Sequence, residues 1–346
     1  HHMNSNLTSS DQAPFIVAEL SGNHGGSLKK ALELVDAAKI SGAHAIKLQT
    51  YKPETITVNS KDDRFLIKEG LWKGKYLHDL YHEAMTPWEW HSEIARKAKE
   101  NELVCFSSPF DETAVDFLEQ EISPPLYKIA SFELNHFPLL KKIALRNQPT
   151  ILSTGMSTIG EIEFALKTLY DNNLEKEKIT VLHCNSAYPT PMEDVNLKAI
   201  RTIKECFDIS VGYSDHTSGI EASIAAVAIG AQIIEKHITL DKNMQGPDHK
   251  ASIEPEELNN LVSAIRNIEK ALGSGIKKPS NSEMKNIKVA RKSIIASDYI
   301  EKGERYTTDN LCIKRPGTGL SPTMFDLLLG MKSNRKYKPN DIIDLN

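Results

Sequence analysis

Residues 209–237 read ISVGYSDHTSGIEASIAAVAIGAQIIEKH, and this stretch decides the fold class. Two short runs, Ile209–Tyr213 and Gln232–Lys236, are rich in β-branched and other apolar residues and predict strands. Between them, Ile220–Ile229 is small and apolar, which predicts a helix that packs tightly. A strand, a helix and another strand in this order predict a parallel βαβ unit.

The same alternation extends from Phe15 to about Gly273. Helical spacing predicts helices at Leu28–Ile40 and Glu254–Leu272, and Gly273 acts as the stop signal of the second. Further strands are predicted at Phe15–Glu19, Ala45–Gln49, Leu103–Ser107, Tyr127–Ala130, Thr150–Ser153 and Ile179–His183. Eight βα units over roughly 250 residues are typical of a closed (β/α)8 barrel, or TIM barrel, in the α/β class.

Composition divides the chain into three predicted segments. Residues 13–273 form the barrel, residues 274–290 form a linker, and residues 291–346 form a small β-rich module. The linker prediction rests on GSGIKKPSN at 273–281, which is rich in Gly, Pro, Ser and Lys. Within the barrel, Tyr51–Met85 is a long insertion between the second and third strands, and loops of this length usually carry function.

The charge and apolar patterns exclude several classes of protein. The chain of 346 residues has a net charge of −4 with both signs scattered, so it lacks the basic surface that nucleic acid requires. Apolar runs fall short of the ~20 residues that cross a bilayer, and residues 1–12 lack the apolar core of a secretion signal. The four cysteines are irregularly spaced without a Cys-x-x-Cys pair, which favours a reducing, cytoplasmic location.

Chemically useful side chains end every predicted strand, and barrel active sites occupy that end. Any one of them could be a polar strand end that meets water, but the joint pattern favours an active site. In chain order they are Glu19, Lys47 with Gln49, Ser107 with Ser108, Lys128 with Ser131 and Glu133, Ser153, His183 with Asn185, Ser214 with His216, and Glu235 with His237.

His216 and His237 end consecutive strands, so a barrel would make them neighbours at one mouth. Two neutral imidazoles there could hold a divalent ion. The alternative is that each is a hydrogen-bonded cap or core histidine. The spacing leaves the identity of the metal open.

Two lysines and several neutral hydrogen-bond donors are predicted around the same mouth of the barrel, and they indicate an anionic ligand. A phosphate and a carboxylate could be bound by Lys47, Lys128, Ser131, Asn185 and Ser214. Either lysine could instead be a rim charge. One of Glu19 and Glu133 could act as acid or base while the other orients a hydroxyl group, or each could form a salt bridge to a nearby lysine.

At these residues the chain resembles the sialic acid synthase family. The resemblance is carried by AELSGNH (18–24), IKLQT (46–50), YKIASFE (127–133), STGM (153–156), YPTP (188–191), GYSDHT (212–217) and EKH (235–237). It implies a (β/α)8 barrel followed by an antifreeze-like (SAF) domain, which residues 291–346 resemble through RPGTGL (315–320). It also implies a domain-swapped homodimer.

The resemblance also implies roles for individual residues. His216 and His237 would ligate a divalent metal, Mn²⁺ or alternatively Mg²⁺ or Co²⁺, and Glu19, Glu133 and His237 would be catalytic. Phosphoenolpyruvate would be bound by Lys47, Lys128, Ser131, Asn185 and Ser214. The sugar would face Gln49, Glu133, Tyr188 and Asp248, and Arg315 would reach in from the partner subunit.

Within the family, FSSPF (106–110), GLWKGK (70–75) and TPWEWH (86–91) look more like pseudaminic acid synthases than N-acetylneuraminate synthases. This implies condensation of phosphoenolpyruvate with 2,4-diacetamido-2,4,6-trideoxy-L-altrose and water to give pseudaminic acid and phosphate. N-acetylneuraminate or legionaminate synthesis is the alternative. The polar rim argues against a third class, a non-catalytic sugar- or ice-binding protein.

Overall fold

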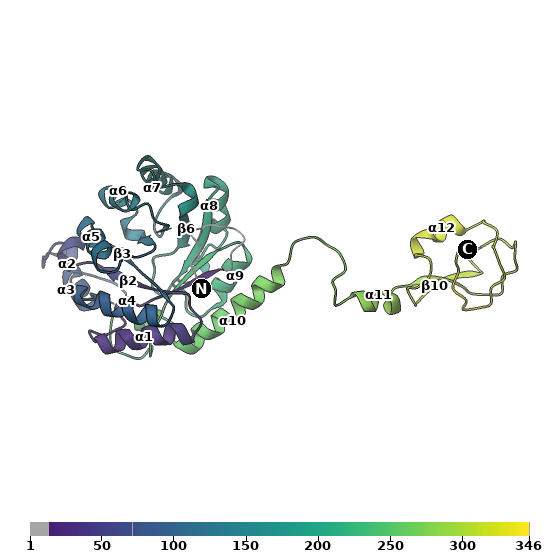
Figure 1. Cartoon of the computed structure of the whole chain (residues 1–346), viewed down its shortest axis with the longest axis horizontal. Coiled ribbons are helices and arrows are strands. Elements are labelled where there is room, and N and C mark those ends of the chain that lie inside the picture. Colours follow the sequence, from purple (N-terminus) through teal and green to yellow (C-terminus); the bar gives the residue numbers. More distant parts are fainter. Residues whose placement is uncertain (1–13, 71, 346) are drawn as a thin grey trace. The chain divides into compact units, whose positions relative to one another are not determined.

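The computed structural model describes residues 14–70 and 72–345, which fall into two compact units that divide after Gly273 (Figure 1). The predicted first residue of the barrel, residue 13, lies outside the described residues, as does Leu71 of the GLWKGK pattern. Within the described residues, no helix is both long enough and apolar enough to cross a membrane.

The described part of the first unit contains an eight-stranded parallel sheet with the order β3-β2-β1-β8-β7-β6-β5-β4. Strands β3 and β4, at the two ends of this order, lie next to each other, so the sheet curls into a barrel. This confirms the predicted (β/α)8 fold. The strands are β1 (Phe15–Glu19), β2 (Ala45–Thr50), β3 (Val104–Pro109), β4 (Tyr127–Ile129), β5 (Thr150–Ser153), β6 (Ile179–Cys184), β7 (Ser210–Asp215) and β8 (Ile233–His237).

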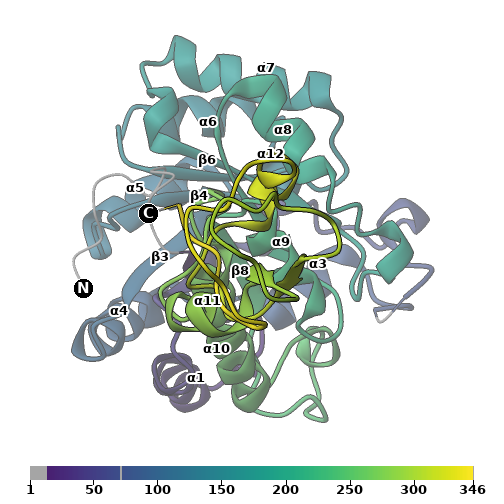
Figure 2. The same ribbon diagram turned by 90° about the vertical axis from the view of Figure 1, so that its right-hand side faces the viewer.

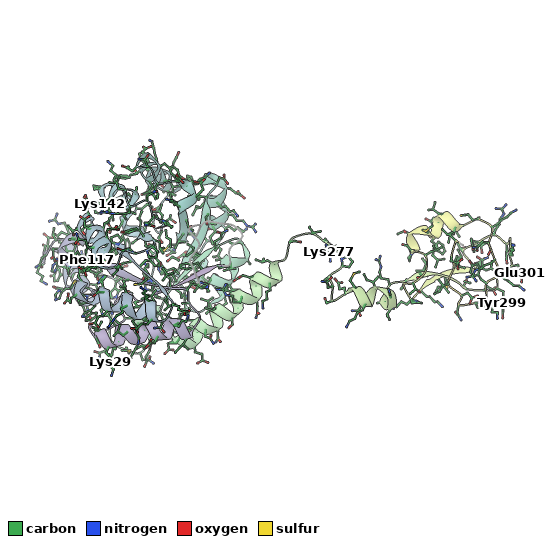
Figure 3. All side chains as sticks on the ribbon, viewed as in Figure 1. Lys29, Phe117, Lys142, Lys277, Tyr299 and Glu301 are labelled. Carbon is green, nitrogen blue, oxygen red and sulfur yellow. The ribbon has the colours of Figure 1, made fainter. Side chains whose placement is uncertain are left out.

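Helices cover the outside of the strands, as Figure 2 shows for α1, α4, α6 and α7. The charged side chains of Lys29 and Lys142 lie on this outer surface (Figure 3). Local sequence sets the ends of the helices: Ser27 accepts a hydrogen bond from Lys30 N at the start of α1, and Gly273 ends α10 with a positive φ of 65°. The helices are α1 (Leu28–Ile40), α2 (Pro53–Ile56), α3 (Leu77–Ala84), α4 (His91–Glu100), α5 (Glu112–Glu121), α6 (Phe137–Ala144), α7 (Ile159–Asp171), α8 (Ala199–Phe207), α9 (Glu221–Ala228) and α10 (Pro255–Leu272).

A buried apolar cluster fills the barrel interior. Its members come from around the barrel and are Val17, Ala45, Phe106, Leu126, Ile151, Leu182 and Ile233. Strand β7 contributes Gly212, where an added Cβ would lie 2.5 Å from both Leu182 Cδ2 and Ile233 O. The small residue is therefore required at this position, and the apolar cluster closes the barrel below the polar strand ends.

The second unit is the predicted small β-rich module. It contains α11 (Met284–Ala290), the antiparallel pair β9 (Ser293–Ala296) and β10 (Leu311–Lys314), and α12 (Phe325–Leu328). Its core includes Ile294, Ile300, Tyr306, Leu311 and Tyr337. Helix α11 occupies residues 284–290 at the end of the segment that was predicted to be a linker.

Candidate active site

A layer of polar side chains lies directly above the apolar cluster. Side chains alternate across a strand, so the residue two positions after each cluster member, and after Gly212 in β7, faces the same interior. These residues are Glu19, Lys47, Ser108, Lys128, Ser153, Cys184, Ser214 and Glu235, and all are buried. The sequence therefore builds a polar floor at the carboxyl ends of the strands.

Glu235 is the centre of a charged network in this layer. Its Oε1 lies 2.9 Å from Lys128 Nζ and 3.4 Å from Lys47 Nζ, and its Oε2 accepts a hydrogen bond of 3.1 Å from Ser214 Oγ. Lys47 Nζ also lies 3.2 Å from Glu19 Oε2. Sequence reasoning named Glu235 as a polar strand end but missed this role, because the contact joins strands far apart in the chain.

The pKa values follow from burial and from this pairing. Burial works against the charge on Lys47, but Glu19 and Glu235 outweigh it and raise its pKa. Burial lowers the pKa of Lys128, and Glu235 offsets only part of this effect. Burial also opposes ionisation of Glu235, yet the two lysines hold its pKa well below the ordinary value. Burial raises the pKa of Glu19, so this carboxyl is the one that most readily holds a proton.

A cavity of about 70 Å³, the inner cavity, opens above the network. Its walls include Lys47, Lys128, Ser131, Ser153, Ser186 and Ser214. Among the described residues, the buried hydroxyls of Ser153 and Ser186 have no hydrogen-bond partner. Buried polar groups are normally paired, so these hydroxyls and the two ammonium groups fit an anionic ligand that accepts hydrogen bonds.

Ser186 occupies the place that sequence reasoning gave to Asn185. The Asn185 side chain serves its own loop, since Nδ2 donates to Asp194 O at 3.2 Å and Oδ1 accepts from Ala187 N at 2.8 Å. Asn185 is not among the residues that line the inner cavity, whereas Ser186 is. The assignment of Asn185 to phosphoenolpyruvate stays a prediction without support from this geometry.

His216 and His237 meet at the inner cavity with ring centroids 5.3 Å apart. The Nδ1 of His216 lies 2.7 Å from Asn185 O, and it donates there, so Nε2 is the nitrogen that could bind a metal. Burial lowers the pKa of His237 well below its ordinary value and keeps the ring neutral. Burial disfavours a proton on His216, but the nearby Cys184 outweighs it and raises the pKa, so a metal would displace that proton.

The donor set fits a divalent cation that keeps open positions. Within residues 14–70 and 72–345, no group of three or more His, Cys, Asp or Glu side chains could hold a metal ion. Two imidazoles alone would leave several coordination positions of such a cation to water or substrate oxygens.

A second cavity of about 130 Å³, the outer cavity, adjoins the inner one. The two cavities share Gln49, Phe110, Phe132, Tyr188 and His237. The remaining polar groups of the outer cavity include Glu133 and Asp248. The 51–85 insertion lines much of the rest through Tyr51, Ile56, Trp72, Leu80, Tyr81 and Ala84. The outer cavity therefore combines an apolar wall with two carboxyl groups.

Both carboxyl groups of the outer cavity are held in place. Asp248 accepts hydrogen bonds from Ser21 Oγ and, at 3.3 Å, from Gly22 N. Glu133 Oε2 lies 3.0 Å from His136 Nδ1. Burial raises the pKa of each carboxyl group, which favours the protonated form more than water would.

Glu19 and Arg315 do not line either cavity. Glu19 is fully buried behind Lys47. Arg315 belongs to the second unit, where its Nε donates to Ala290 O at 2.6 Å. A catalytic role for Glu19 and a contribution of Arg315 from a partner subunit stay predictions.

The neighbouring charged pair Asp215 and Lys236 lies outside the cavities. Lys236 Nζ is 3.2 Å from Asp215 Oδ2, and Asp215 also accepts hydrogen bonds from Thr217 and Ser223. Both residues are buried on the opposite face of their strands from His216 and His237. They stabilise the loop after β7 and the start of α9.

Comparison with known proteins matches residues 34–277 to the NeuB family and residues 291–346 to the SAF domain. The chain is 44% identical to an N,N'-diacetyllegionaminic acid synthase and 43% identical to a pseudaminic acid synthase, both of Campylobacter jejuni, over 95% and 96% of its length and 98% and 96% of theirs. The solved N-acetylneuraminic acid synthetase of Leptospira borgpetersenii is 36% identical with a TM-score of 0.71, over 80% of this chain and 90% of that one. The chain therefore belongs to the NeuB family with a C-terminal SAF domain, which confirms the predicted membership of the sialic acid synthase family and the prediction that it is an enzyme.

Proposed function

We propose that the chain condenses phosphoenolpyruvate with a 2,4-diacetamido-2,4,6-trideoxyhexose and water, releasing phosphate and a nonulosonic acid. The proposed acceptor is the L-altrose isomer, which gives pseudaminic acid, and legionaminic acid is the alternative product. The observation that carries the proposal is the pair of adjoining cavities. The inner one is lined by ammonium and hydroxyl groups and the outer one by apolar and carboxyl groups, and they meet at His237.

Phosphoenolpyruvate fits the chemistry of the inner cavity. Its phosphate and carboxylate would take hydrogen bonds from Lys47 and Lys128 and from the unpartnered hydroxyls of Ser153 and Ser186. Ser131 and Ser214 lie in the same wall. Glu19 would act as a positioning residue in this arrangement, because it holds Lys47 from behind.

The outer cavity would hold the acceptor with its aldehyde towards His237. A divalent cation bound by His216 and His237, with Mn²⁺ as the first candidate and Mg²⁺ or Co²⁺ as alternatives, would act as a Lewis acid on the aldehyde oxygen. Gln49, Tyr188 and Asp248 would orient the sugar through its hydroxyl and amide groups, and Arg315 of the partner subunit in a domain-swapped homodimer would complete the site.

The reaction forms one C–C bond and one C–O bond, the latter to the oxygen of water, and it breaks the C–O bond to the phosphate. Carbon C3 of phosphoenolpyruvate attacks the aldehyde carbon, and positive charge develops at C2. Water adds to C2 and loses a proton, and the resulting intermediate expels phosphate with its bridging oxygen. Glu133 lies in the outer cavity with a pKa raised by burial, so it would donate or accept the protons, while Lys47 and Lys128 stabilise the departing phosphate.

The walls of the outer cavity favour a trideoxy acceptor over N-acetylmannosamine. A trideoxy sugar carries a methyl group at C6 and two acetyl methyl groups, which suit the side chains of Ile56, Trp72, Leu80 and Ala84. N-acetylmannosamine would place a C6 hydroxyl in these surroundings. The relatives named after pseudaminic and legionaminic acid are almost equally similar to the chain, so the acceptor assay must distinguish those two sugars.

The test is phosphate release from phosphoenolpyruvate with added Mn²⁺ and a panel of amino-sugars. The altrose isomer should give the highest kcat/KM, followed by the isomer that gives legionaminic acid, with N-acetylmannosamine last. Preference for N-acetylmannosamine would contradict the acceptor assignment. Failure to release phosphate with every sugar would contradict the proposed activity itself.

A further inference from the structure

Trp72 connects the 51–85 insertion to the loop after β8. Its indole Nε1 donates a hydrogen bond of 2.7 Å to Pro247 O, and Pro247 immediately precedes Asp248. Asp248 is in turn hydrogen-bonded to Ser21 and Gly22 in the loop after β1. A single side chain of the insertion is therefore tied to the part of the outer cavity that carries a carboxyl group.

The indole ring itself is part of the cavity wall. It lines the outer cavity with its centroid 6.3 Å from that of Tyr188, and Tyr188 packs on His216 at 4.0 Å. An indole has one hydrogen-bond donor and no acceptor. Because that donor is already used by Pro247 O, Trp72 presents only apolar surface to whatever occupies the cavity.

We propose that Trp72 is a specificity-determining residue, which selects an acceptor that turns a methyl group rather than a hydroxyl towards this wall. The inference rests on the proposed function and adds which side chain makes the choice. A hydroxyl placed against the indole would lose water and find no partner there. Discrimination by an apolar wall against an added hydroxyl is typically limited to roughly 100-fold, so this is the upper bound for Trp72.

The test compares Trp72→Ala and Trp72→Phe with Trp88→Phe as the matched control. The indole Nε1 of Trp88 also donates to a backbone carbonyl, Tyr51 O at 3.0 Å, but Trp88 lines neither cavity. Each variant is assayed as the full chain with Mn²⁺, with phosphoenolpyruvate and acceptor varied separately. The acceptors are a trideoxy sugar and its counterpart with a C6 hydroxyl.

Trp72→Ala should raise the KM of the trideoxy acceptor about 10-fold or more and reduce the preference for it over the hydroxylated sugar. The KM of phosphoenolpyruvate should stay within about twofold, because the inner cavity is unchanged. Trp72→Phe keeps an apolar ring but loses the hydrogen bond, so its effect should be smaller. Trp88→Phe should leave the preference unchanged.

Fluorescence gives a readout that does not depend on turnover. Acceptor added to the wild-type protein should change tryptophan emission, and this change should disappear in Trp72→Phe but persist in Trp88→Phe. An unchanged acceptor preference in folded Trp72→Phe and Trp72→Ala would overturn the inference, as would the same loss of preference in Trp88→Phe. In both of these outcomes the wild-type protein is still active, so they contradict only the role of Trp72. A wild-type protein without activity would instead overturn the proposed function.

Discussion

Replacing Lys47 by Met removes one of the two buried ammonium groups of the inner cavity while keeping a side chain of similar length. If phosphoenolpyruvate binds there, the variant loses a contact between a cation and an anion. Two unit charges 4 Å apart interact by about 4 kcal/mol at an effective dielectric constant of 20, and a hydrogen bond to a charged group is worth about 1.5–3 kcal/mol. A loss of about 2–4 kcal/mol corresponds to a KM for phosphoenolpyruvate that rises about 30- to 700-fold.

Stability should suffer less than the loss of a buried ion pair usually implies. Breaking such a pair typically costs about 3–5 kcal/mol, because one charge is left without a partner. In Lys47→Met, Glu235 keeps Lys128 at 2.9 Å. Burial already raises the pKa of Glu19, so this carboxyl can take up a proton when Lys47 is absent. The loss in the free energy of unfolding should therefore fall below that range.

Lys236→Met is the matched control for this experiment. Lys236 is also a buried lysine in an ion pair, with Asp215, but it lines neither cavity. The assay is phosphate release with phosphoenolpyruvate and acceptor titrated separately, together with urea unfolding. Lys236→Met should lower stability and leave both KM values of the folded enzyme unchanged. The reasoning is refuted if Lys47→Met raises only the acceptor KM, or if Lys236→Met raises the phosphoenolpyruvate KM equally.

Four further predictions follow from the site and the fold. His216→Ala and His237→Ala should each abolish turnover in a protein with unchanged circular dichroism, and full activity of chelator-treated wild type would contradict the metal site. Phosphoenolpyruvate labelled with ¹⁸O at the bridging oxygen should release the label in phosphate, not in the sugar acid. Burial lowers the pKa of His91 from 6.5 to about 4, so the unfolded chain binds the proton first. The contribution of His91 to the free energy of unfolding should therefore fall by about 1.4 kcal/mol per pH unit as the pH drops from 6.5 towards 4. His91→Gln should reduce the measured slope by this amount, while His24 and His44, whose pKa values burial also lowers to about 4, keep their share. Mixing Arg315→Ala with His237→Ala after dissociation should restore activity if Arg315 acts in the partner's site, and no recovery would contradict the swap.

The barrel could be predicted from the sequence because its strands and helices have strong local patterns. Phe15–Glu19, Thr150–Ser153 and Leu28–Ile40 were predicted with the bounds that the structure has. Strand β7 was predicted to end at Tyr213 but runs to Asp215. The apolar pattern stops at Tyr213, whereas the pairing of β7 with β8 continues through Ser214 and Asp215, and this pairing depends on backbone groups rather than on side chains.

Contacts between distant segments could not be read from local patterns. The ion pair of Lys128 with Glu235 depends on where the closed barrel brings β4 and β8 together, because both side chains must reach across the interior. The hydrogen bond of Trp72 to Pro247 O joins two loops whose paths the sequence does not specify. The charged network around Glu235 and the wall of the outer cavity therefore could not be predicted from the sequence alone.

Within the strands, the side on which a residue lies decides its role more reliably than its chemical type. Leu182 belongs to the interior cluster, so Cys184, at the end of β6, faces the interior. In the loop that follows, Ser186 lines the inner cavity and Asn185 does not, although an amide is the more obvious ligand for an anion. The same alternation, starting from Ile233, places Glu235 and His237 on the interior side of β8. Lys236 lies on the other side of the strand, where it pairs with Asp215. Once one interior residue of a strand is known, the alternation of side chains therefore predicts from the sequence which other residues of that strand face inwards. Residues beyond the strand ends, such as Glu133 and Asp248, lie in loops where the alternation no longer applies, and only their observed contacts place them in the outer cavity.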